Sequence, residues 1–370
     1  MIQRWDIFCR IVDNFGDIGV CWRLARQLSQ EYGIHVRLWV DDIPVAQRLL
    51  PGLDAGLPQQ QLEGVTIACW DNDFICDSVA EVVIEAFACE LPASYIQAMV
   101  ATPPVWINLD YLSAETWVEE YHQQPSPHPR LPLKKTFFFP GFTERTGGLL
   151  REHDLLTQRK QYQLSLQQLQ PTTDHTSALR VSLFAYPQAD IATLLTGMAA
   201  SERPVQCLIP ESSLLQPVSH FFGKSRLCVG DSLTQGALTV EVLPFLSQPD
   251  YDRLLWSCDL NFVRGEDSWI RAIWAGKPFI WQPYLQEEDA HIIKLEAFLG
   301  RYLSGLDTET ASTWSAFHHA WAHMQLASGD WPQLLKILPA AQAHTICQAQ
   351  SLAEQADMTT QLVNFVRNFQ

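Results

Sequence analysis

The sequence predicts an α/β protein with two Rossmann-like domains that face each other across a cleft, followed by a helical C-terminal tail. Three observations support this fold class. Short apolar runs alternate with amphipathic runs, the alternation starts again after a proline-rich stretch, and 370 residues are about the length of two compact domains. Hydrophobic residues make up 47% of the chain, so each domain has enough of them for a core.

We expect residues 1–170 to form the first domain, which a C-terminal helix at residues 351–370 completes. Apolar runs of strand length occur at residues 5–12, 34–40, 65–70, 81–87 and 105–110. Runs with helical spacing occur at residues 18–33, 45–52, 93–101 and 151–170. The stretch 123–148 is rich in proline and glycine, which predicts an irregular connecting segment or a functional loop.

In the second domain we expect residues 177–350, where the same alternation returns. Runs of strand character occur at residues 178–186, 205–210, 238–245, 260–263 and 277–283. Helical runs occur at residues 189–201, 248–258 and 268–276. After residue 287 the pattern is helical almost to the end of the chain.

The composition excludes several classes of function. A net charge of −16 argues against binding to nucleic acid or to an anionic membrane surface, and fits an enzyme or a protein whose partner presents a basic patch. No apolar run approaches the ~20 residues that a membrane-spanning helix needs. The nine cysteines are odd in number, scattered in spacing and mostly set in apolar runs. This pattern is typical of reduced thiols in a cytoplasmic protein.

The turn between the first predicted strand and helix carries two acids, Asp13 and Asp17. Gly16 and Gly19 resemble part of a dinucleotide-binding loop, but the first glycine of that pattern is absent and the acids would repel a phosphate. Either aspartate alone could simply cap the helix. Two carboxylates at the carboxyl end of one strand favour chemistry, in which one acts as general base and the other orients or tunes it.

A second turn, at residues 264–268, joins a predicted strand to a predicted helix that begins near Ser268. Backbone N–H groups and the positive end of the helix dipole can bind an anion such as a diphosphate, and Arg264 supplies a fork suited to phosphate oxygens. Glu266 is placed to accept hydrogen bonds from sugar hydroxyls. The alternative is an ordinary junction in which Arg264 pairs with Glu266 and Asp267, but the density of functional side chains favours a binding site.

Aromatic residues also follow predicted strands. Phe184 and Tyr186 are two residues apart at the end of one strand, and Phe245 and Gln248 are expected to end another strand at the same edge of the sheet. Such rings could stack on a nucleobase and Gln248 could read a base edge, although core packing is the commoner role of any single aromatic residue.

No cofactor or metal ion is expected. His319 and His323 are four residues apart on a predicted helix, but no third ligand accompanies them, so solvated helix positions are the favoured interpretation. The serines and cysteines show no nucleophile-elbow pattern.

Four stretches together resemble a known family, the EarP family of bacterial protein-arginine rhamnosyltransferases. They are the segments at residues 7–28, 184–187, 244–284 and 286–291, which begin IFCRIVDNFGDIG, FAYP, PFLSQPDYDRLLW and QEEDAH. The resemblance covers nearly the whole chain. It implies a GT-B glycosyltransferase that moves L-rhamnose, with inversion, from dTDP-β-L-rhamnose to an arginine of translation elongation factor P. The modified factor would help ribosomes through polyproline stretches.

The resemblance also implies residue roles. The first domain would bind the acceptor protein through a loop made of Asn14, Phe15, Gly16 and Asp17, with Asp13 and Asp17 as catalytic carboxylates and Asp17 favoured as the base. Glu266 would be a third critical acid on the donor side. Phe184 and Phe245 would enclose thymine and Gln248 would read it. The ribose and diphosphate would be surrounded by Tyr186, Arg264, Asp267 and Ser268.

Elementary chemistry agrees with this assignment. The acceptor is a guanidinium with a pKa above ~12, which a pair of carboxylates can hold and help to deprotonate. An inverting transfer needs one displacement and no metal motif. Two alternatives remain open: a GT-B transferase with another nucleotide sugar or acceptor, and a non-catalytic adaptor that binds nucleotide sugars.

Overall fold

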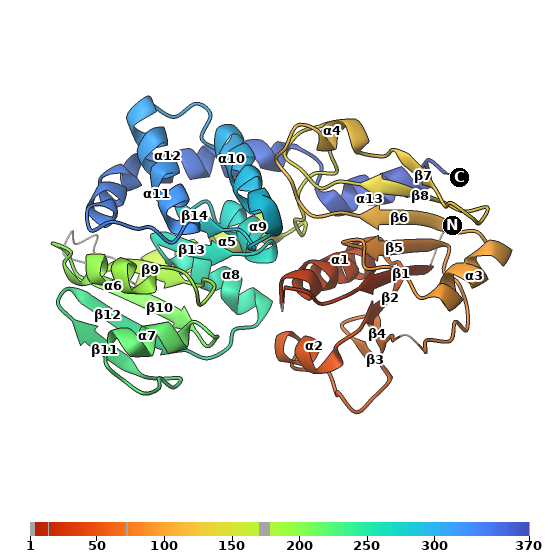
Figure 1. Ribbon diagram of the computed structural model, residues 1–370, viewed down its shortest axis with the longest axis horizontal. Helices are drawn as coiled ribbons and strands as arrows, with labels where there is room; N and C mark the ends of the chain where they lie inside the picture. Colours follow the sequence, from red (N-terminus) through yellow and green to blue (C-terminus); the bar gives the residue numbers. More distant parts are fainter. Residues whose placement is uncertain (1–3, 14, 72, 170–177, 370) are drawn as a thin grey trace. The chain divides into compact units, whose positions relative to one another are not determined.

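The computed structural model describes residues 4–13, 15–71, 73–169 and 178–369. The chain forms two compact units (Figure 1). The first comprises residues 1–153 and 353–370, and the second comprises residues 154–352. Each unit is an α/β domain with a mostly parallel sheet, as the sequence predicts.

In the described part of the first unit the sheet has eight strands. Their order is β3 (Gln59–Leu62), β4 (Val65–Cys69), β2 (His35–Val40), β1 (Arg4–Cys9), β5 (Val82–Ala86), β6 (Val105–Leu109), β8 (Lys134–Phe138) and β7 (Pro125–Pro127). The outer strands β3 and β7 are antiparallel to their neighbours, and the pairs between them are parallel. The carboxyl ends of β1, β5 and β6 therefore lie side by side at one edge of the sheet.

The helices of the first unit follow the predicted alternation. They are α1 (Gly16–Tyr32), α2 (Ile43–Leu49), α3 (Ala93–Ala101), α4 (Val118–Tyr121) and α13 (Met358–Arg367). α1 buries most of its length and ends at Gly33, whose φ of 65° is a left-handed conformation that glycine adopts without strain. Because α1 follows β1 directly, the Asp13–Asp17 turn is held between a buried strand and a buried helix.

The described sheet of the second unit has six strands. Their order is β11 (Ser232–Gln235), β12 (Leu238–Leu243), β10 (Val205–Pro210), β9 (Leu179–Leu183), β13 (Leu260–Arg264) and β14 (Phe279–Gln282). β11 is antiparallel and the other pairs are parallel. Strands β9, β13 and β14 are neighbours, so the loops that follow them meet at one edge.

The helices of the second unit include the helical C-terminal region that the sequence predicts. They are α5 (Leu155–Leu169), α6 (Ile191–Ala199), α7 (Leu215–Phe221), α8 (Gln248–Ser257), α9 (Asp267–Ala275), a 3-10 turn (Glu287–Asp289), α10 (Ala290–Tyr302), α11 (Thr308–Ala322) and α12 (Asp330–Glu354). Within the described chain no helix combines the length and the apolar character needed to cross a membrane.

Two expectations about the first domain need correction. The proline-rich stretch 123–148 is not wholly irregular, because it contains β7 and β8. β8 pairs with β6, and the prolines of β7 are tolerated because β7 is an edge strand. Helix α5 belongs to the second unit, where Arg159 Nη1 donates a 2.6 Å hydrogen bond to the Trp274 carbonyl oxygen, so the first segment ends near residue 153 rather than 170.

The C-terminal helix α13 packs on α1, far from it in sequence. Thr359 Oγ1 donates a 2.6 Å hydrogen bond to Gln27 Oε1, and the hydroxyl groups of Tyr32 and Thr360 are 2.7 Å apart. Leu362 of α13 is fully buried. The last helix of the chain is therefore part of the core that supports α1.

We expect Leu362→Ala to lower the free energy of unfolding of the first unit by about 2–5 kcal/mol, because it leaves a cavity where a fully buried side chain was. Urea unfolding of the full chain measures this effect. Asn364→Ala, at an exposed position of the same helix, is the matched control and should change the unfolding curve little. Equal unfolding curves for the two variants would contradict a structural role of α13.

Candidate functional site

The loop between β1 and α1 is organised by the carboxylate of Asp17. Asp17 Oδ2 accepts hydrogen bonds from the backbone N–H groups of Val12, at 2.8 Å, and Asp13, at 2.9 Å. The hydroxyl group of Tyr111 lies 3.2 Å from Asp17 Oδ1 and donates to it. Asp17 is only 2% exposed. These N–H donors precede the helix, so Asp17 holds the loop and is not a simple helix cap.

Burial raises the pKa of Asp17 above the ordinary value for an aspartate. The hydrogen bonds from Asp13 and Val12 oppose this shift because they favour the ionised form, the negative charge of Asp13 adds to it, and the Tyr111 hydroxyl opposes it. A carboxylate with a raised pKa is a stronger base than a solvated one. The site thus has the electronic property that a proton acceptor needs.

Asp13 lies close to the start of α1 and is less buried than Asp17. Its carbonyl oxygen accepts the Gly16 N–H at 2.7 Å, and a Cβ atom at position 16 would lie 3.0 Å from Asp13 Oδ2. Gly16 therefore leaves room for the Asp13 carboxylate. Phe15, the residue before α1, has the Arg48 guanidinium 5.7 Å from its ring centre, whereas Asn14 lies outside the described residues.

Sequence reasoning missed Tyr111, which follows β6, and Phe87, which follows β5. Their rings are stacked, with centroids 4.3 Å apart and an interplanar angle of 14°. Tyr111 reaches the β1–α1 loop through its hydrogen bond to Asp17, and Phe87 packs on Tyr111, because β5 and β6 are the next strands along the sheet. The strand order is the signal that identifies them, and it becomes known only from the tertiary structure.

In the second unit the β13–α9 turn joins the end of a strand directly to the start of a helix. β13 ends at Arg264, Gly265 has φ 60°, and Glu266 precedes the first helical residue, Asp267. Ser268 lies within the first turn of α9 and does not cap it. Its hydroxyl donates to the Arg264 carbonyl oxygen and accepts the Arg264 N–H at 3.1 Å. The N-terminus of α9 is consequently held against the end of β13.

Arg264 is buried between aromatic side chains. Its guanidinium carbon lies 4.6 Å from the ring centre of Phe184 and 4.4 Å from that of Tyr186. The Tyr186 N–H donates to Gln282 Oε1 at 2.9 Å, and Gln282, at the end of β14, accepts the Gly265 N–H at its carbonyl oxygen. Residues at the ends of three different strands, β9, β13 and β14, are thus brought together at one edge.

Phe245 and Gln248 do not end a strand, in contrast to the prediction. β12 ends at Leu243, Phe245 lies half-buried in the following loop, and Gln248 is the buried first residue of α8. The reason is local: Ser247 caps the helix by accepting the Asp250 N–H, and a proline occupies the first turn.

Helices α8 and α9 are joined by a buried ion pair that sequence reasoning also missed. Arg271 donates from Nε and Nη2 to the two carboxylate oxygens of Asp252, at 2.8 and 2.7 Å. Arg271 is 2% exposed and Asp252 is 5% exposed. The pair aligns the helix that begins at Gln248 with the helix that begins at Asp267.

We expect Asp252→Asn to destabilise the second unit by about 3 kcal/mol, because it leaves the buried Arg271 charge without a compensating carboxylate. Guanidinium unfolding of the full chain measures the loss. Asp250→Asn is the control, since Asp250 pairs with Arg253 at an exposed position and should matter by less than about 1 kcal/mol. A loss of equal size in both variants would overturn this assignment.

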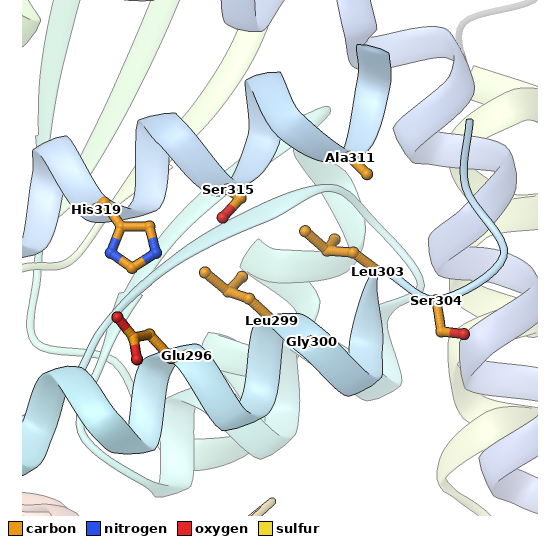
Figure 2. A pocket seen from close by; sticks show the side chains of 8 residues that line it. All are labelled: Glu296, Leu299, Gly300, Leu303, Ser304, Ala311, Ser315 and His319. Atoms are coloured by element: carbon orange, nitrogen blue, oxygen red, sulfur yellow. The ribbon is translucent and has the colours of Figure 1, made fainter. Parts of the chain in front are cut away.

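Outside the predicted site residues, the described part of the chain has a groove but no metal-binding group. Among the described residues no group of three or more histidine, cysteine, aspartate or glutamate side chains is close enough to hold a metal ion. A groove of about 540 Å³ lies between α10 and α11, where Glu296 and His319 point toward each other (Figure 2). None of the predicted site residues lines that groove.

Comparison with known proteins gives consistent results. A family model described as "Elongation-Factor P (EF-P) rhamnosyltransferase EarP" matches residues 5–367. A protein-arginine rhamnosyltransferase of Pseudomonas putida is 47% identical, with 100% of both chains covered. One from Pseudomonas aeruginosa is 44% identical, with 98% of this chain and 99% of the relative covered.

Solved structures agree with the sequence matches. A structure described as "Structural basis for EarP-mediated arginine glycosylation of translation elongation factor EF-P" is 35% identical and covers 99% of each chain, with a TM-score of 0.69. A spinosyn rhamnosyltransferase complexed with thymidine diphosphate has a TM-score of 0.52 at 10% identity, over 98% of this chain and 99% of that one, which supports the GT-B fold alone. The full-length family match and the close relatives show that this chain belongs to the EarP family of elongation factor P rhamnosyltransferases.

Proposed function

We propose that the chain transfers L-rhamnose from dTDP-β-L-rhamnose to an arginine side chain of translation elongation factor P, with inversion and without a metal ion. The modified factor then serves ribosomes stalled at polyproline stretches. The observation that carries the proposal is the full-length match to the EarP family, joined to two sites of complementary charge. One is the Asp13–Asp17 loop of the first unit, and the other is the β13–α9 turn of the second.

The first unit supplies the acceptor side. The loop of Asn14, Phe15, Gly16 and Asp17 receives the arginine, whose guanidinium is always charged at neutral pH. Asp13 grips and orients it. Asp17 accepts a proton, a role that the raised pKa of its buried carboxyl supports.

The second unit supplies the donor side. Phe184 and Phe245 enclose the thymine ring, and Gln248, buried at the start of α8, reads its edge. The ribose and diphosphate are bound by Tyr186, Arg264, Asp267 and Ser268 at the N-terminus of α9, where helix N–H groups favour an anion. Glu266 accepts hydrogen bonds from donor hydroxyl groups and is the third critical acid.

The transfer is one displacement. A terminal nitrogen of the guanidinium attacks the anomeric carbon, and the bond from that carbon to the diphosphate oxygen breaks. dTDP leaves with the electron pair, and the proton lost by the attacking nitrogen passes to Asp17. Arg264 and the α9 amide groups offset the negative charge that grows on the leaving diphosphate. A single attack from the face opposite the leaving group inverts the anomeric centre.

The test is to incubate the chain with elongation factor P and dTDP-rhamnose and to measure the intact mass of the acceptor. A single deoxyhexose increment that maps to one arginine supports the proposal, and no increment refutes it. UDP-glucose in place of dTDP-rhamnose is the donor control and should give none. A reaction in EDTA should proceed at the same rate, whereas loss of activity that added Mg²⁺ restores would refute metal independence.

A further inference from the structure

We propose that Tyr111 is a positioning residue that holds the Asp17 carboxylate ready for proton transfer. The inference rests on the proposed function, because it assigns Asp17 as the base. It starts from an arrangement of three consecutive strand ends, in which Tyr111 from the end of β6 reaches past β5 to the loop after β1.

The orientation of Asp17 depends on both of its oxygens. Oδ2 accepts two backbone N–H groups of the loop, at 2.8 and 2.9 Å, and these bonds limit rotation of the carboxylate. In this orientation the other oxygen, Oδ1, faces Tyr111. The Tyr111 hydroxyl is 3.2 Å from Oδ1, which is long for a hydroxyl–carboxylate bond. A neutral hydroxyl donor leaves the negative charge on the carboxylate. Because Oδ2 already accepts two N–H groups, we take Oδ1 as the oxygen that receives the proton.

Tyr111 is itself fixed in place. Its ring is stacked on Phe87 with centroids 4.3 Å apart, and its N–H donates to Asp110 Oδ1 at 2.8 Å. Phe87 has φ 55°, an uncommon conformation for a bulky residue, and its N–H donates to the Leu109 carbonyl oxygen at 2.7 Å. Such strained backbone persists where the surroundings impose it and is concentrated at functional sites.

The charged and titratable groups around Asp17 come from several elements. They are Asp13 in the same loop, the buried thiol of Cys9 at the end of β1, Asp41 after β2, which accepts the Ile11 N–H at 2.9 Å, Arg48 of α2 near Phe15, and Asp110 beside Tyr111. Among these groups the negative charge of Asp13 favours the protonated form of Asp17. The Tyr111 hydroxyl stabilises the ionised form of Asp17, so removing that hydroxyl should raise the pKa of Asp17 further.

The test compares Tyr111→Phe with wild type in kcat/KM for rhamnose transfer from pH 5.5 to pH 9. We expect the loss to grow as pH falls, to about tenfold at the lowest pH and less than about twofold at the highest, because the variant shifts Asp17 toward its protonated form. Tyr32→Phe is the control. Tyr32 ends α1, the helix that contains Asp17, and its hydroxyl group bonds to Thr360 far from Asp17, so this variant should leave the pH profile unchanged.

A loss of the same factor at every pH, or no loss at all, would overturn the positioning role while leaving the proposed function intact. If wild type transfers no rhamnose, the proposed function itself fails. Phe87→Leu keeps the Tyr111 hydroxyl but removes its stacking partner, and should shift the acid limb in the same direction. A wild-type profile for Phe87→Leu would refute the role of the stack. Thermal unfolding of each variant separates a change in rate from a loss of folded protein.

Discussion

Asp17→Asn is expected to lower kcat for rhamnose transfer by at least about a thousandfold, because an amide cannot accept the proton of the acceptor nitrogen. The shape of the site should survive. An asparagine side-chain oxygen can still accept the N–H groups of Val12 and Asp13, and the amide has the size of the carboxyl group. Acceptor and donor binding should change little, so KM should move far less than kcat.

The same substitution should not destabilise the fold at neutral pH. The pKa of Asp17 is raised on folding, so the folded state holds its proton more tightly than the unfolded state. The contribution of Asp17 to the free energy of unfolding therefore falls as pH rises from its unfolded-state pKa to its folded-state pKa. Above both pKa values the ionised carboxyl destabilises the fold by its full amount. Asparagine carries no such cost, so the Tm of Asp17→Asn at pH 7 should equal or exceed that of wild type.

Quenched reactions analysed by mass spectrometry measure kcat, and thermal unfolding of the same preparations measures Tm. Asp54→Asn, at an exposed position of the same unit, is the matched control and should keep wild-type kcat and Tm. Wild-type kcat in Asp17→Asn would remove the assignment of Asp17 as base. A large fall in Tm would mean that the lost rate reflects a disordered loop.

Arg264→Lys is expected to raise the KM for dTDP-rhamnose by about 30-fold or more, although it keeps the positive charge. The Arg264 guanidinium is flat, buried, and packed against the rings of Phe184 and Tyr186 at 4.6 and 4.4 Å. A lysine ammonium has no planar face for these rings and no pair of parallel N–H donors for a diphosphate. Both the packing against these rings and the proposed contact with the diphosphate should therefore be weakened.

Binding of dTDP gives an independent measurement, since a ligand that binds the native state raises Tm. The shift in Tm that saturating dTDP produces in wild type should be largely lost in Arg264→Lys. Arg253→Lys, at an exposed position of α8, should keep the full shift. An unchanged shift in Arg264→Lys would show that Arg264 does not contact the diphosphate.

The alternation of strands and helices was predictable because it follows from local periodicity, and most predicted runs correspond to elements of the structure. The prediction failed where long-range pairing overrides local composition. Residues 134–138 form β8 within a proline-rich stretch because β6 offers them a partner, and helix α5 contacts Trp274 of the second unit. Gln248 was expected to end a strand and also to open the helical run at residues 248–258. The second expectation is the one that holds, because Ser247 and Pro249 are a helix-start signal.

The site was predictable in part. The turns that carry Asp13, Asp17, Arg264 and Glu266 are visible in the sequence because glycine and charged residues interrupt apolar runs at strand ends. Phe184 and Tyr186 were rightly expected to lie at a strand end, since they follow β9, and the structure adds that Arg264 lies against both rings. Tyr111 and Phe87 were not found, because they lie about 70 to 100 residues beyond Asp17 in the sequence and no local pattern links them to it.

The sequence by itself determined the fold class, the family and the two turns where the acids and Arg264 lie, since these depend on residue types within a short window. The tertiary structure decided which oxygens of Asp17 are held, by which donors, and which rings pack on Arg264. The physical reason is that strand order brings distant loop residues together. Their hydrogen bonds and ring contacts depend on distances of a few ångströms that no single stretch of sequence contains.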